Sequence, residues 1–365
     1  MPHWRYYLPS GYSIEEIYSR IFMSLKTSRI QCRDLTLVAV VYLVFLFGWL
    51  VVYLLTGDRF IVIAFLNFVA IYLFVPLALV LLVAIVCKNR WLGIGFLAGV
   101  LALVMLWGDH FIPTVDVEST DQPKLRVMTY NVLAWHEYYE PLLETIRFED
   151  PHVLLIQELN TGLAEILESE LIDEYPYQVL AALDNPEGIG VISKFPLSPS
   201  GVNLPQLWAG SPQILDLEWN DQKILLVNFH LTPTDGVYPL DEEKAHIRAR
   251  EKEAQLLNGL ASQSNAAIIG GDANMPFLSD AYKEMTRNLV DAYRSVGAGL
   301  GHTFPGSTLP ESDRPHIGRL FIPAWLMRID YIFHSEEWAA VSAHTAKIDG
   351  VSDHRGVVVD LVLKY

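Results

Sequence analysis

The chain has 365 residues, of which 52% are hydrophobic and 19% charged, and its formal net charge is −16. This much apolar material excludes an ordinary soluble enzyme over the whole length, because a soluble fold has too little interior to cover it. The apolar residues run almost continuously from Thr36 to Trp107, whereas charged and turn residues return at globular frequency from Asp109 onward. The sequence therefore predicts a membrane region that ends near Asp109 and is followed by a globular domain.

The globular part is strongly acidic. Four of the 42 acidic residues and eight of the 26 Lys and Arg precede Asp109, which leaves 38 acidic and 18 basic residues, a formal charge of −20, in the rest of the chain. Long duplex DNA is bound mainly by Lys and Arg that neutralise phosphates. This balance argues against a processive nucleic-acid-binding protein and leaves room only for a small local basic pocket. Cys32 and Cys87 are the only cysteines, so the globular part has neither a disulfide framework nor a cysteine-based zinc site.

Three apolar stretches, at about 36–55, 60–87 and 91–107, are separated by short charged loops. Each can cross a hydrocarbon core of about 30 Å, the third only just. Buried core helices are the alternative, but these need a polar face, and the three stretches show none. The expected division is a cytoplasmic N-terminal segment at 1–35, three transmembrane helices at 36–108, a linker at 109–123 and a catalytic domain at 124–365.

The orientation follows from the distribution of basic residues. Five Lys or Arg lie in residues 1–35, one in the first loop and two in the second. Because positively charged flanks stay on the cytoplasmic side, we expect a multi-pass protein of the plasma (inner) membrane with a cytoplasmic N-terminus. An odd number of spans then places the catalytic domain on the extracytoplasmic side, with the lipid bilayer as one partner.

The globular part alternates strand-like and helix-like patterns. Helices are expected at 139–148, 162–172 and 241 to about 260. Strands are expected at 125–132, 153–157, 178–182, 189–193, 214–219, 223–229, 267–269, 329–334 and 357–363. Strands joined both through helices and by hairpins predict mixed sheets with helices outside, an α/β fold.

Polar side chains follow nearly every one of these strands. Taken singly each has an ordinary explanation: Asp272 a turn, Glu158 a helix cap, His230 a core histidine. Together they supply carboxylates for a hard cation, amides for a phosphate and a carboxylate with two imidazoles for proton transfer, which metal-assisted phosphoester hydrolysis requires. Because open α/β sheets place sites beyond strand ends, we expect these residues to converge: Asn131, Glu158, His230, Asp272, Asn274, Asp330, Asp353 and His354.

Six short blocks carry a resemblance to a known family: Thr129-Tyr130-Asn131-Val132, Ile156-Gln157-Glu158-Leu159, Asn228-Phe229-His230-Leu231, Gly271-Asp272-Ala273-Asn274, Arg328-Ile329-Asp330-Tyr331 and Ser352-Asp353-His354. In this order they resemble the endonuclease/exonuclease/phosphatase family, which has the DNase I-like fold. The likeness covers about 125–363, and an ordered set is far more specific than one short motif. It implies a four-layer α/β sandwich of two mixed sheets flanked by helices, with an active site at one end.

The resemblance also implies the metal site. Glu158 corresponds to the principal Mg²⁺ ligand, with Asn131 beside it and Asp353 as a further contributor, and Mn²⁺ is a substitute. Some nucleases of the family have an acidic residue where this chain has Leu133. We therefore expect one magnesium ion.

The remaining roles follow from the same resemblance. His354 corresponds to the histidine at the scissile phosphate, oriented by Asp330 as carboxylates orient imidazoles in other hydrolases. Asp272 corresponds to the residue that positions or deprotonates the attacking water. Further donors to phosphate oxygens are Asn274 and His230, and weaker substrate-binding candidates, for which a solvated loop is the alternative, are His302, Arg314 and Arg319.

Three functions are compatible with the sequence. The first is a membrane-anchored Mg²⁺-dependent hydrolase, a phosphodiesterase or phosphatase, whose substrate is a phospholipid headgroup or a small exterior phosphoester. Tethering favours a membrane-proximal substrate by raising its effective concentration. The second is an extracytoplasmic nuclease, which the acidic domain disfavours. The third is a catalytically inactive, membrane-tethered binding module, which would have no need for all six polar blocks.

Overall fold

The computed structural model describes residues 14–112, 122–135, 137–202, 204, 211–234, 238–306, 316–317, 320–347 and 352–364, with side chains described from residue 31 onward outside 316–321. The chain forms two compact units. The first comprises the chain up to Val52 together with Ile71–Met105, and the second comprises Tyr53–Ala70 together with the chain from Leu106 onward. The short segment between the first two predicted spans thus belongs to the same unit as the globular domain.

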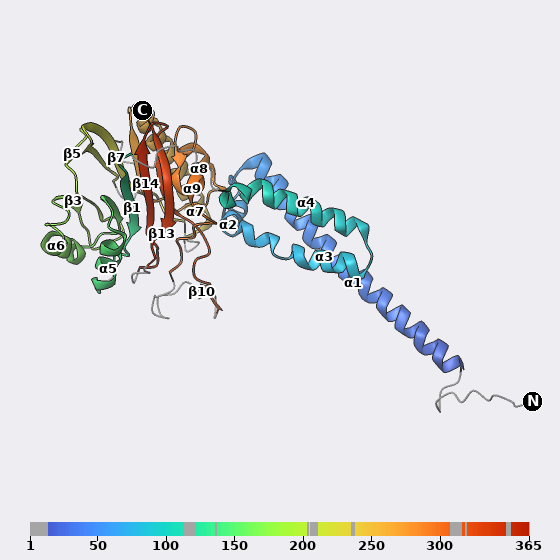
Figure 1. Cartoon of the computed structure of the whole chain (residues 1–365). Helices are drawn as coiled ribbons and strands as arrows, with labels where there is room; N and C mark the ends of the chain where they lie inside the picture. Colours follow the sequence, from blue (N-terminus) through green and yellow to red (C-terminus); the bar gives the residue numbers. More distant parts are fainter. Residues whose placement is uncertain are drawn as a thin grey trace, which may run out of the picture. The chain divides into compact units, whose positions relative to one another are not determined.

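The first unit is built from apolar helices (Figure 1). Two segments, Gln31–Thr56 and Arg90–Phe111, are long and apolar enough to cross a membrane, and only 17% and 22% of their apolar windows are buried. Most of their side chains therefore face outward, as lipid-facing helices require. The predicted second span is bent by 83° between Ile61–Phe68 and Ala70–Val86, so it counts as a third span only if the bent pair is one broken span. The helices of the N-terminal part of the chain are α1 (Ile14–Thr56), α2 (Ile61–Phe68), η1 (Ala70–Phe74), α3 (Leu77–Val86) and α4 (Arg90–Trp107), of which α2 belongs to the second unit.

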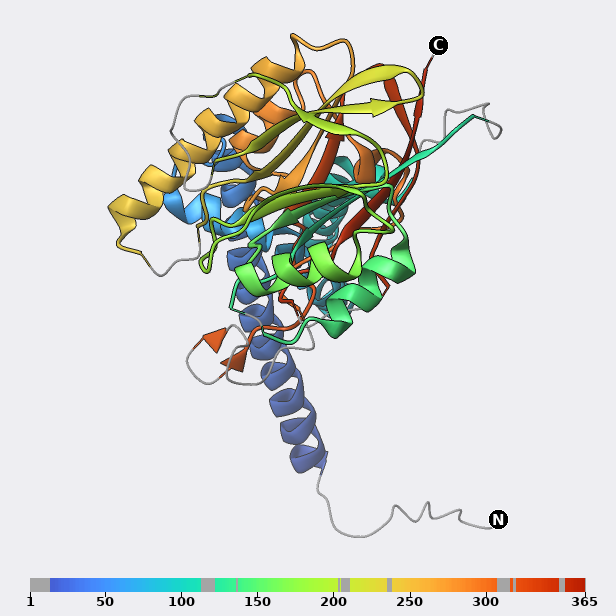
Figure 2. The ribbon, with the colours of Figure 1, turned by 90° about the vertical axis from the view of Figure 1, so that its left-hand side faces the viewer.

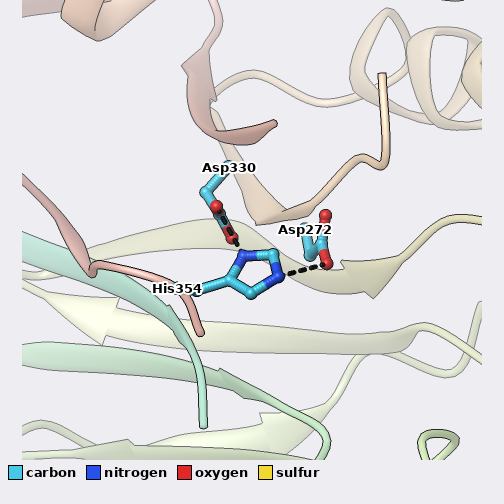
Figure 3. A group of neighbouring side chains, drawn as sticks. All are labelled: Asp272, Asp330 and His354. Atoms are coloured by element: carbon cyan, nitrogen blue, oxygen red, sulfur yellow. Dashed lines mark hydrogen bonds and ion pairs between the residues drawn. The ribbon is translucent and has the colours of Figure 1, made fainter. Parts of the chain in front are cut away.

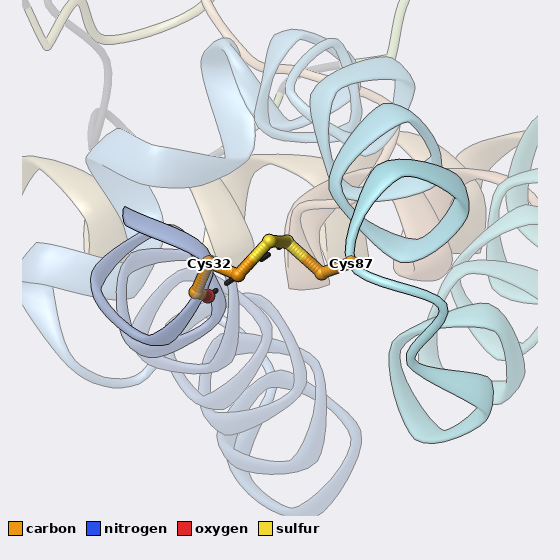
Figure 4. Close-up of a disulfide and its surroundings, with 2 residues drawn as sticks. All are labelled: Cys32 and Cys87. Carbon is orange, nitrogen blue, oxygen red and sulfur yellow. Dashed lines mark hydrogen bonds between the residues drawn. A yellow bond between two sulfur atoms is a disulfide. The ribbon is translucent and has the colours of Figure 1, made fainter. Parts of the chain in front are cut away.

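A disulfide joins the two cysteines of the first unit. Cys32 precedes the first apolar stretch and Cys87 ends the second, and their Cα atoms lie 5.5 Å apart (Figure 4). The beginning of one apolar stretch and the end of the next are therefore neighbours in space.

The globular part contains two six-stranded mixed sheets. Each has one parallel pair, β1 with β2 and β7 with β8, and its other neighbours are antiparallel. The first sheet, in spatial order, is β13 (Trp338–Thr345), β14 (Val357–Leu363), β1 (Leu125–Asn131), β2 (Val153–Gln157), β4 (Ile189–Ser193) and β3 (Tyr177–Ala181). The second is β5 (Leu197–Pro199), β6 (Gln213–Trp219), β7 (Gln222–His230), β8 (Ala267–Asp272), β12 (Asp330–His334) and β9 (Val290–Asp291).

The sheets face each other and helices cover their outer faces. Val127 and Leu155 of the first sheet pack with Leu226 and Ile268 of the second in one core between them. Figure 2 shows α5 (Glu140–Glu149) and α6 (Thr161–Glu170), in green, on one side and α7 (Leu240–Ala261), in gold, on the other. Alternating side chains make each central strand apolar on both faces, which only a layer on each side can bury. The predicted α/β sandwich of two mixed sheets with outer helices is confirmed.

The predicted strands and helices of this domain are present with their ends shifted by a few residues. The sequence analysis missed β13, whose pairing with β14 shifts register between Ala340 and Ser342 and whose side chains lack a clean alternation. Short elements that depend on tertiary contacts were also missed: β5, β9, α8 (Asp280–Met285), α9 (Ala292–Val296), β10 (His316–Ile317), β11 (Leu320–Phe321) and the single-turn η2 (Gly108–Phe111).

Candidate functional site

The carboxyl ends of the two parallel strand pairs meet at one end of the sandwich. In the second sheet, His230 and Asp272 end β7 and β8 in register, and Asp330 at the start of antiparallel β12 pairs with Asp272. In the first sheet, Asn131 ends β1, and Glu158 follows β2. Parallel strands bring their carboxyl ends to one edge, and the facing of the sheets brings both edges together.

Asn131 connects the two sheets within the site. Its Nδ2 donates to Glu158 Oε1 at 2.9 Å and to Asp272 Oδ2 at 3.0 Å, while its Oδ1 accepts from the Leu133 amide at 3.1 Å. The second carboxylate oxygen of Glu158 accepts from the Ala134 amide at 3.1 Å. The amide side chain, fully buried, therefore fixes both carboxylates.

His354 lies between two buried carboxylates (Figure 3). Its Nδ1 is 2.9 Å from Asp330 Oδ2, and its Nε2 is 3.7 Å from Asp272 Oδ2. The Ser352 hydroxyl accepts from the His354 amide at 3.0 Å and donates to the Asn131 carbonyl at 2.7 Å. The Phe304 ring also contacts the imidazole, with centroids 5.0 Å apart. Asp330 thus holds one ring nitrogen and leaves the other directed at Asp272.

The electrostatic surroundings favour a charged imidazole. Burial by itself would lower the pKa of His354, but Asp330, Asp272 and Asp353 outweigh burial and raise this pKa well above its ordinary value. In the absence of a bound cation, His354 is therefore the group that compensates this cluster of carboxylates.

Asp353 provides a test of whether the site suits a metal ion. Its Oδ1 is buried and accepts no hydrogen bond from the described residues, although His354 Nε2 lies 4.0 Å away. Burial raises the pKa of Asp353 to about 6, and the charges of Glu158 and Asp272 add to that rise while His354 opposes it. An unbonded carboxylate oxygen close to further carboxylates is the environment that a hard divalent cation stabilises. The residues present fit such an ion.

Two sets of side chains could hold the cation. Ligand atoms of Asp272, Asp330 and His354 lie within 4.8 Å of one another. In that set Asp330 Oδ2 already binds the imidazole, and its buried Oδ1 accepts no hydrogen bond from the described residues. The sequence-predicted set of Glu158, Asn131 and Asp353 has the more suitable oxygen donors, so we favour it.

His230 and Asn274 complete the cluster. His230 Nδ1 is 3.1 Å from the Pro186 carbonyl, which leaves Nε2 facing Asp272 Oδ2 at 3.5 Å. The Asn274 amide donates to Asp272 Oδ1 at 2.9 Å, and its side chain donates to the Leu231 carbonyl at 3.0 Å. These contacts hold the side chains of both residues at the strand ends, close to Asp272.

The backbone is unusual at two of these positions. Glu158 and Asn274 have φ values of 57° and 49°, in the left-handed region that residues other than glycine rarely adopt. Such conformations cost about 1–3 kcal/mol each and occur most often at functional sites. At Gly271 a side chain is excluded, because a Cβ would lie 1.8 Å from the Phe229 carbonyl oxygen.

A buried polar chain beneath the site was missed by the sequence analysis. Gln157 accepts from the Thr129 hydroxyl at 3.2 Å and donates to Asn228 Oδ1 at 2.6 Å. Asn228 donates in turn to the carbonyls of Ile156 at 2.9 Å and Gly190 at 2.8 Å. This chain crosses from one sheet to the other. The signal was present in the sequence, since one member lies in each of the first three blocks.

Of the three weaker substrate candidates, only His302 lies in the part of the chain that the structure describes. His302 Nδ1 is 2.7 Å from the Trp325 carbonyl, and burial lowers the pKa of this histidine. Arg314 and Arg319 lie outside the described residues. More informative is Thr303, whose hydroxyl accepts from the Ile329 and Asp330 amides at 3.2 and 3.4 Å and so supports the start of β12.

Comparison with solved structures finds several chains of limited similarity. An endonuclease/exonuclease/phosphatase from Beutenbergia cavernae is 21% identical, with a TM-score of 0.47 over 66% of this chain and 72% of that chain. A family protein from Bacteroides thetaiotaomicron is 16% identical, with a TM-score of 0.49 over 67% of this chain and 100% of that chain. D. rerio TDP2 complexed with a single strand DNA product is 15% identical, with a TM-score of 0.49 over 65% of this chain and 98% of that chain.

The family itself is identified by sequence. No curated protein was found to match the chain. Residues 128–354 match the profile of the Endonuclease/Exonuclease/phosphatase family, a range that covers more than half of the chain and contains all the polar strand-end residues described above. The chain therefore belongs to the endonuclease/exonuclease/phosphatase family.

Proposed function

We propose that this protein is a divalent-metal-dependent phosphoester hydrolase, a phosphodiesterase or phosphatase that is anchored in a membrane. The observation that carries the proposal is the meeting of Glu158, Asp272 and His354 at one end of the sandwich, joined by Asn131 and supported by Asp330. Family membership indicates phosphoester hydrolysis in general, and this cluster indicates that the chain retains the groups for it. An inactive binding module would have no use for a buried, unbonded carboxylate oxygen.

Glu158 and Asp353 would hold the cation, and Asn131 would keep Glu158 in position. A bound Mg²⁺, for which Mn²⁺ could substitute, would supply positive charge to the phosphate oxygens as negative charge develops there. We expect one ion, because Leu133 stands where a second acidic ligand would be required.

Asp272 would position the attacking water and accept its proton. Its two oxygens accept from the Asn274 amide and the Asn131 side chain, so the carboxylate is aimed into the site and rigidly held. His354 Nε2 and His230 Nε2 face the same carboxylate and would donate to phosphate oxygens. Water then attacks phosphorus in line with the leaving oxygen, and the P–O bond to that oxygen breaks.

We further propose three membrane crossings. The apolar segment Gln31–Thr56 has 26 residues, a helix about 39 Å long at about 1.5 Å per residue. The Cα atom of Cys87, at the end of the second apolar stretch, is 5.5 Å from that of Cys32, at the beginning of the first. The bent second stretch would therefore cross back through the same thickness of membrane as the first. With the N-terminus cytoplasmic, three crossings place residues 124–365, the proposed catalytic domain, outside the cytoplasm. The substrate would then be a phosphoester at or near the outer surface of the membrane, and the acidity of the domain disfavours long nucleic acids.

The test is hydrolysis of bis-p-nitrophenyl phosphate by the full-length protein in detergent, with Mg²⁺ or with EDTA. We compare Glu158→Gln with its matched control Glu165→Gln on the exposed face of α6, and His354→Ala with His344→Ala. Plasmid DNA and phospholipid vesicles are offered in parallel.

Metal-dependent turnover that is lost in Glu158→Gln and His354→Ala but kept in both controls would establish the hydrolase. Preference among the substrates would then separate lipid from nucleic acid. Full activity of Glu158→Gln would refute the metal assignment. Absence of turnover from folded wild-type protein on every substrate would favour the binding module.

A further inference from the structure

A cavity of about 510 Å³ lies between α7 and the turn that follows α1. Its walls come from Thr56 at the end of α1, from Arg59 of the turn, from one face of α7 and from Asp280 at the start of α8. None of its lining residues belongs to the candidate active site. The volume falls in the range of about 300–1,000 Å³ that is typical of small-molecule sites.

The cavity gathers positive charge in a domain that is otherwise acidic. Lys244, Arg248 and Lys252 follow one another at four-residue spacing, so they line one face of α7, and Arg59 contributes from the turn. Lys244 is paired with Asp241 at 2.9 Å. In the part of the chain that the structure describes, no carboxylate pairs with Arg59, Arg248 or Lys252, all of which are exposed.

The carboxylates in the cavity compensate little of this charge. Asp58 is buried, and its amide donates to Asp280 Oδ2 at 3.2 Å. Burial raises the pKa of Asp58 to about 7, and the hydrogen bond to the Asp280 carboxyl adds to that rise. Asp280 is itself paired with Lys283 at 2.7 Å. Glu251 remains as an acidic group on the wall, against Arg59, Arg248 and Lys252, which have no carboxylate partner among the described residues.

The position of the turn places this cavity at the membrane surface. Thr56 is the last residue of the apolar segment Gln31–Thr56, whose mean hydropathy is 2.7. The turn is fixed to the globular domain at Gly57, whose φ is 61° and where a Cβ would lie 2.2 Å from Asp280 Oδ1. Residues directly after a spanning helix lie among the lipid headgroups. Cations at this level are attracted to anionic lipids.

We propose that this cavity binds the phosphate of an anionic phospholipid from the bilayer that the chain crosses, as a site separate from the active site. Arg248 and Lys252 donate to the phosphate from α7, and Arg59 donates from the turn. The acyl chains remain in the bilayer beside the end of α1. Bound lipid then holds α7 and the turn together, and with them the globular domain against the membrane surface.

The experiment measures binding alone, so its outcome is independent of hydrolysis. Full-length protein in detergent is titrated with dihexanoyl phosphatidylglycerol, dihexanoyl phosphatidylcholine, inorganic phosphate and a single-stranded oligonucleotide, by microscale thermophoresis. The test variant is Arg248→Gln with Lys252→Gln. One control, Lys124→Gln with Lys364→Gln, removes the same charge from exposed positions elsewhere, and another, Arg248→Lys with Lys252→Arg, keeps the charge in the cavity.

We expect the wild type to bind phosphatidylglycerol about tenfold or more tightly than phosphatidylcholine, and the test variant to lose that preference. Both controls should bind as the wild type does. The proposal is overturned if the two lipids bind equally, if the test variant keeps its preference, or if phosphate or the oligonucleotide binds more tightly than phosphatidylglycerol. The last result would indicate a site for soluble anions or for nucleic acid.

Discussion

Replacement of Gly271 by alanine tests how closely β7 and β8 approach each other beneath the active site. The added Cβ would lie 1.8 Å from the Phe229 carbonyl oxygen, whereas such contacts are normally more than 3 Å, so the strands must separate by over 1 Å. Overpacking of a tight interior typically costs about 1–3 kcal/mol. Because both strands are central in their sheet, we expect about 3 kcal/mol, which lowers the melting temperature by roughly 6–12 °C. The shift also moves Asp272, the next residue, and a misplacement of about 1 Å can reduce turnover about 100-fold.

Thermal unfolding of the full-length protein, followed by tryptophan fluorescence, and turnover of bis-p-nitrophenyl phosphate measure the two effects. The matched control is Gly259→Ala in α7, where a Cβ would meet nothing within 4 Å. In a helix this change should stabilise by about 0.5–1 kcal/mol. If Gly271→Ala melts and turns over as the wild type does, the close approach of the strands, and the geometry of the site built on it, are wrong.

Three further predictions concern the support of the site and the orientation in the membrane. Asp330→Asn should lower kcat about 100-fold, because the carboxylate that orients His354 is lost, while KM and the affinity for Mn²⁺ change little. A large loss of Mn²⁺ affinity would instead show that Asp330 is a metal ligand. Asn228→Ala should destabilise by about 2 kcal/mol or more, measured by urea unfolding, because two carbonyls and Gln157 lose their buried partner; an unchanged midpoint would show that the inter-sheet chain contributes nothing. The proposed orientation places Cys32 and Cys87 at the cytoplasmic face, where the disulfide of the structure would be kept reduced, so in intact cells both should react only with a membrane-permeant maleimide. A persistent disulfide that is labelled from outside after reduction would mean the opposite orientation.

The sequence predicted which polar side chains converge, because these residues lie at strand ends. Residues such as Glu158 and Asp272 follow short apolar runs directly, so their place in the sheet can be inferred from local pattern, and topology then brings them together. The contacts that hold them could not be inferred in this way. The bond from Asn131 to Asp272 joins residues 141 positions apart, and the Asn228 contacts depend on how the two sheets face each other.

The apolar helical region could also be predicted only in part. Hydropathy predicted where the chain is apolar, but it did not predict the 83° bend within 60–87, since both halves of that stretch are equally apolar. Nor could it predict that the two cysteines are neighbours, because their approach depends on the path of the whole intervening segment.

Helix α7 best illustrates why charge alone is a poor guide to exposure. Its sequence is typical of a solvated helix, yet Arg250 and Glu253 are buried. Glu253 accepts from the Thr232 amide at 3.0 Å and Arg250 donates to the Thr232 carbonyl at 3.0 Å, which fixes the chain two residues after His230. On the face of α7 that lines the basic cavity, by contrast, the cationic side chains must stay accessible to bind a ligand. One helix therefore supports the active site on one face and offers the proposed lipid site on another, so a substitution on α7 must be assigned to a face before its effect on activity is interpreted.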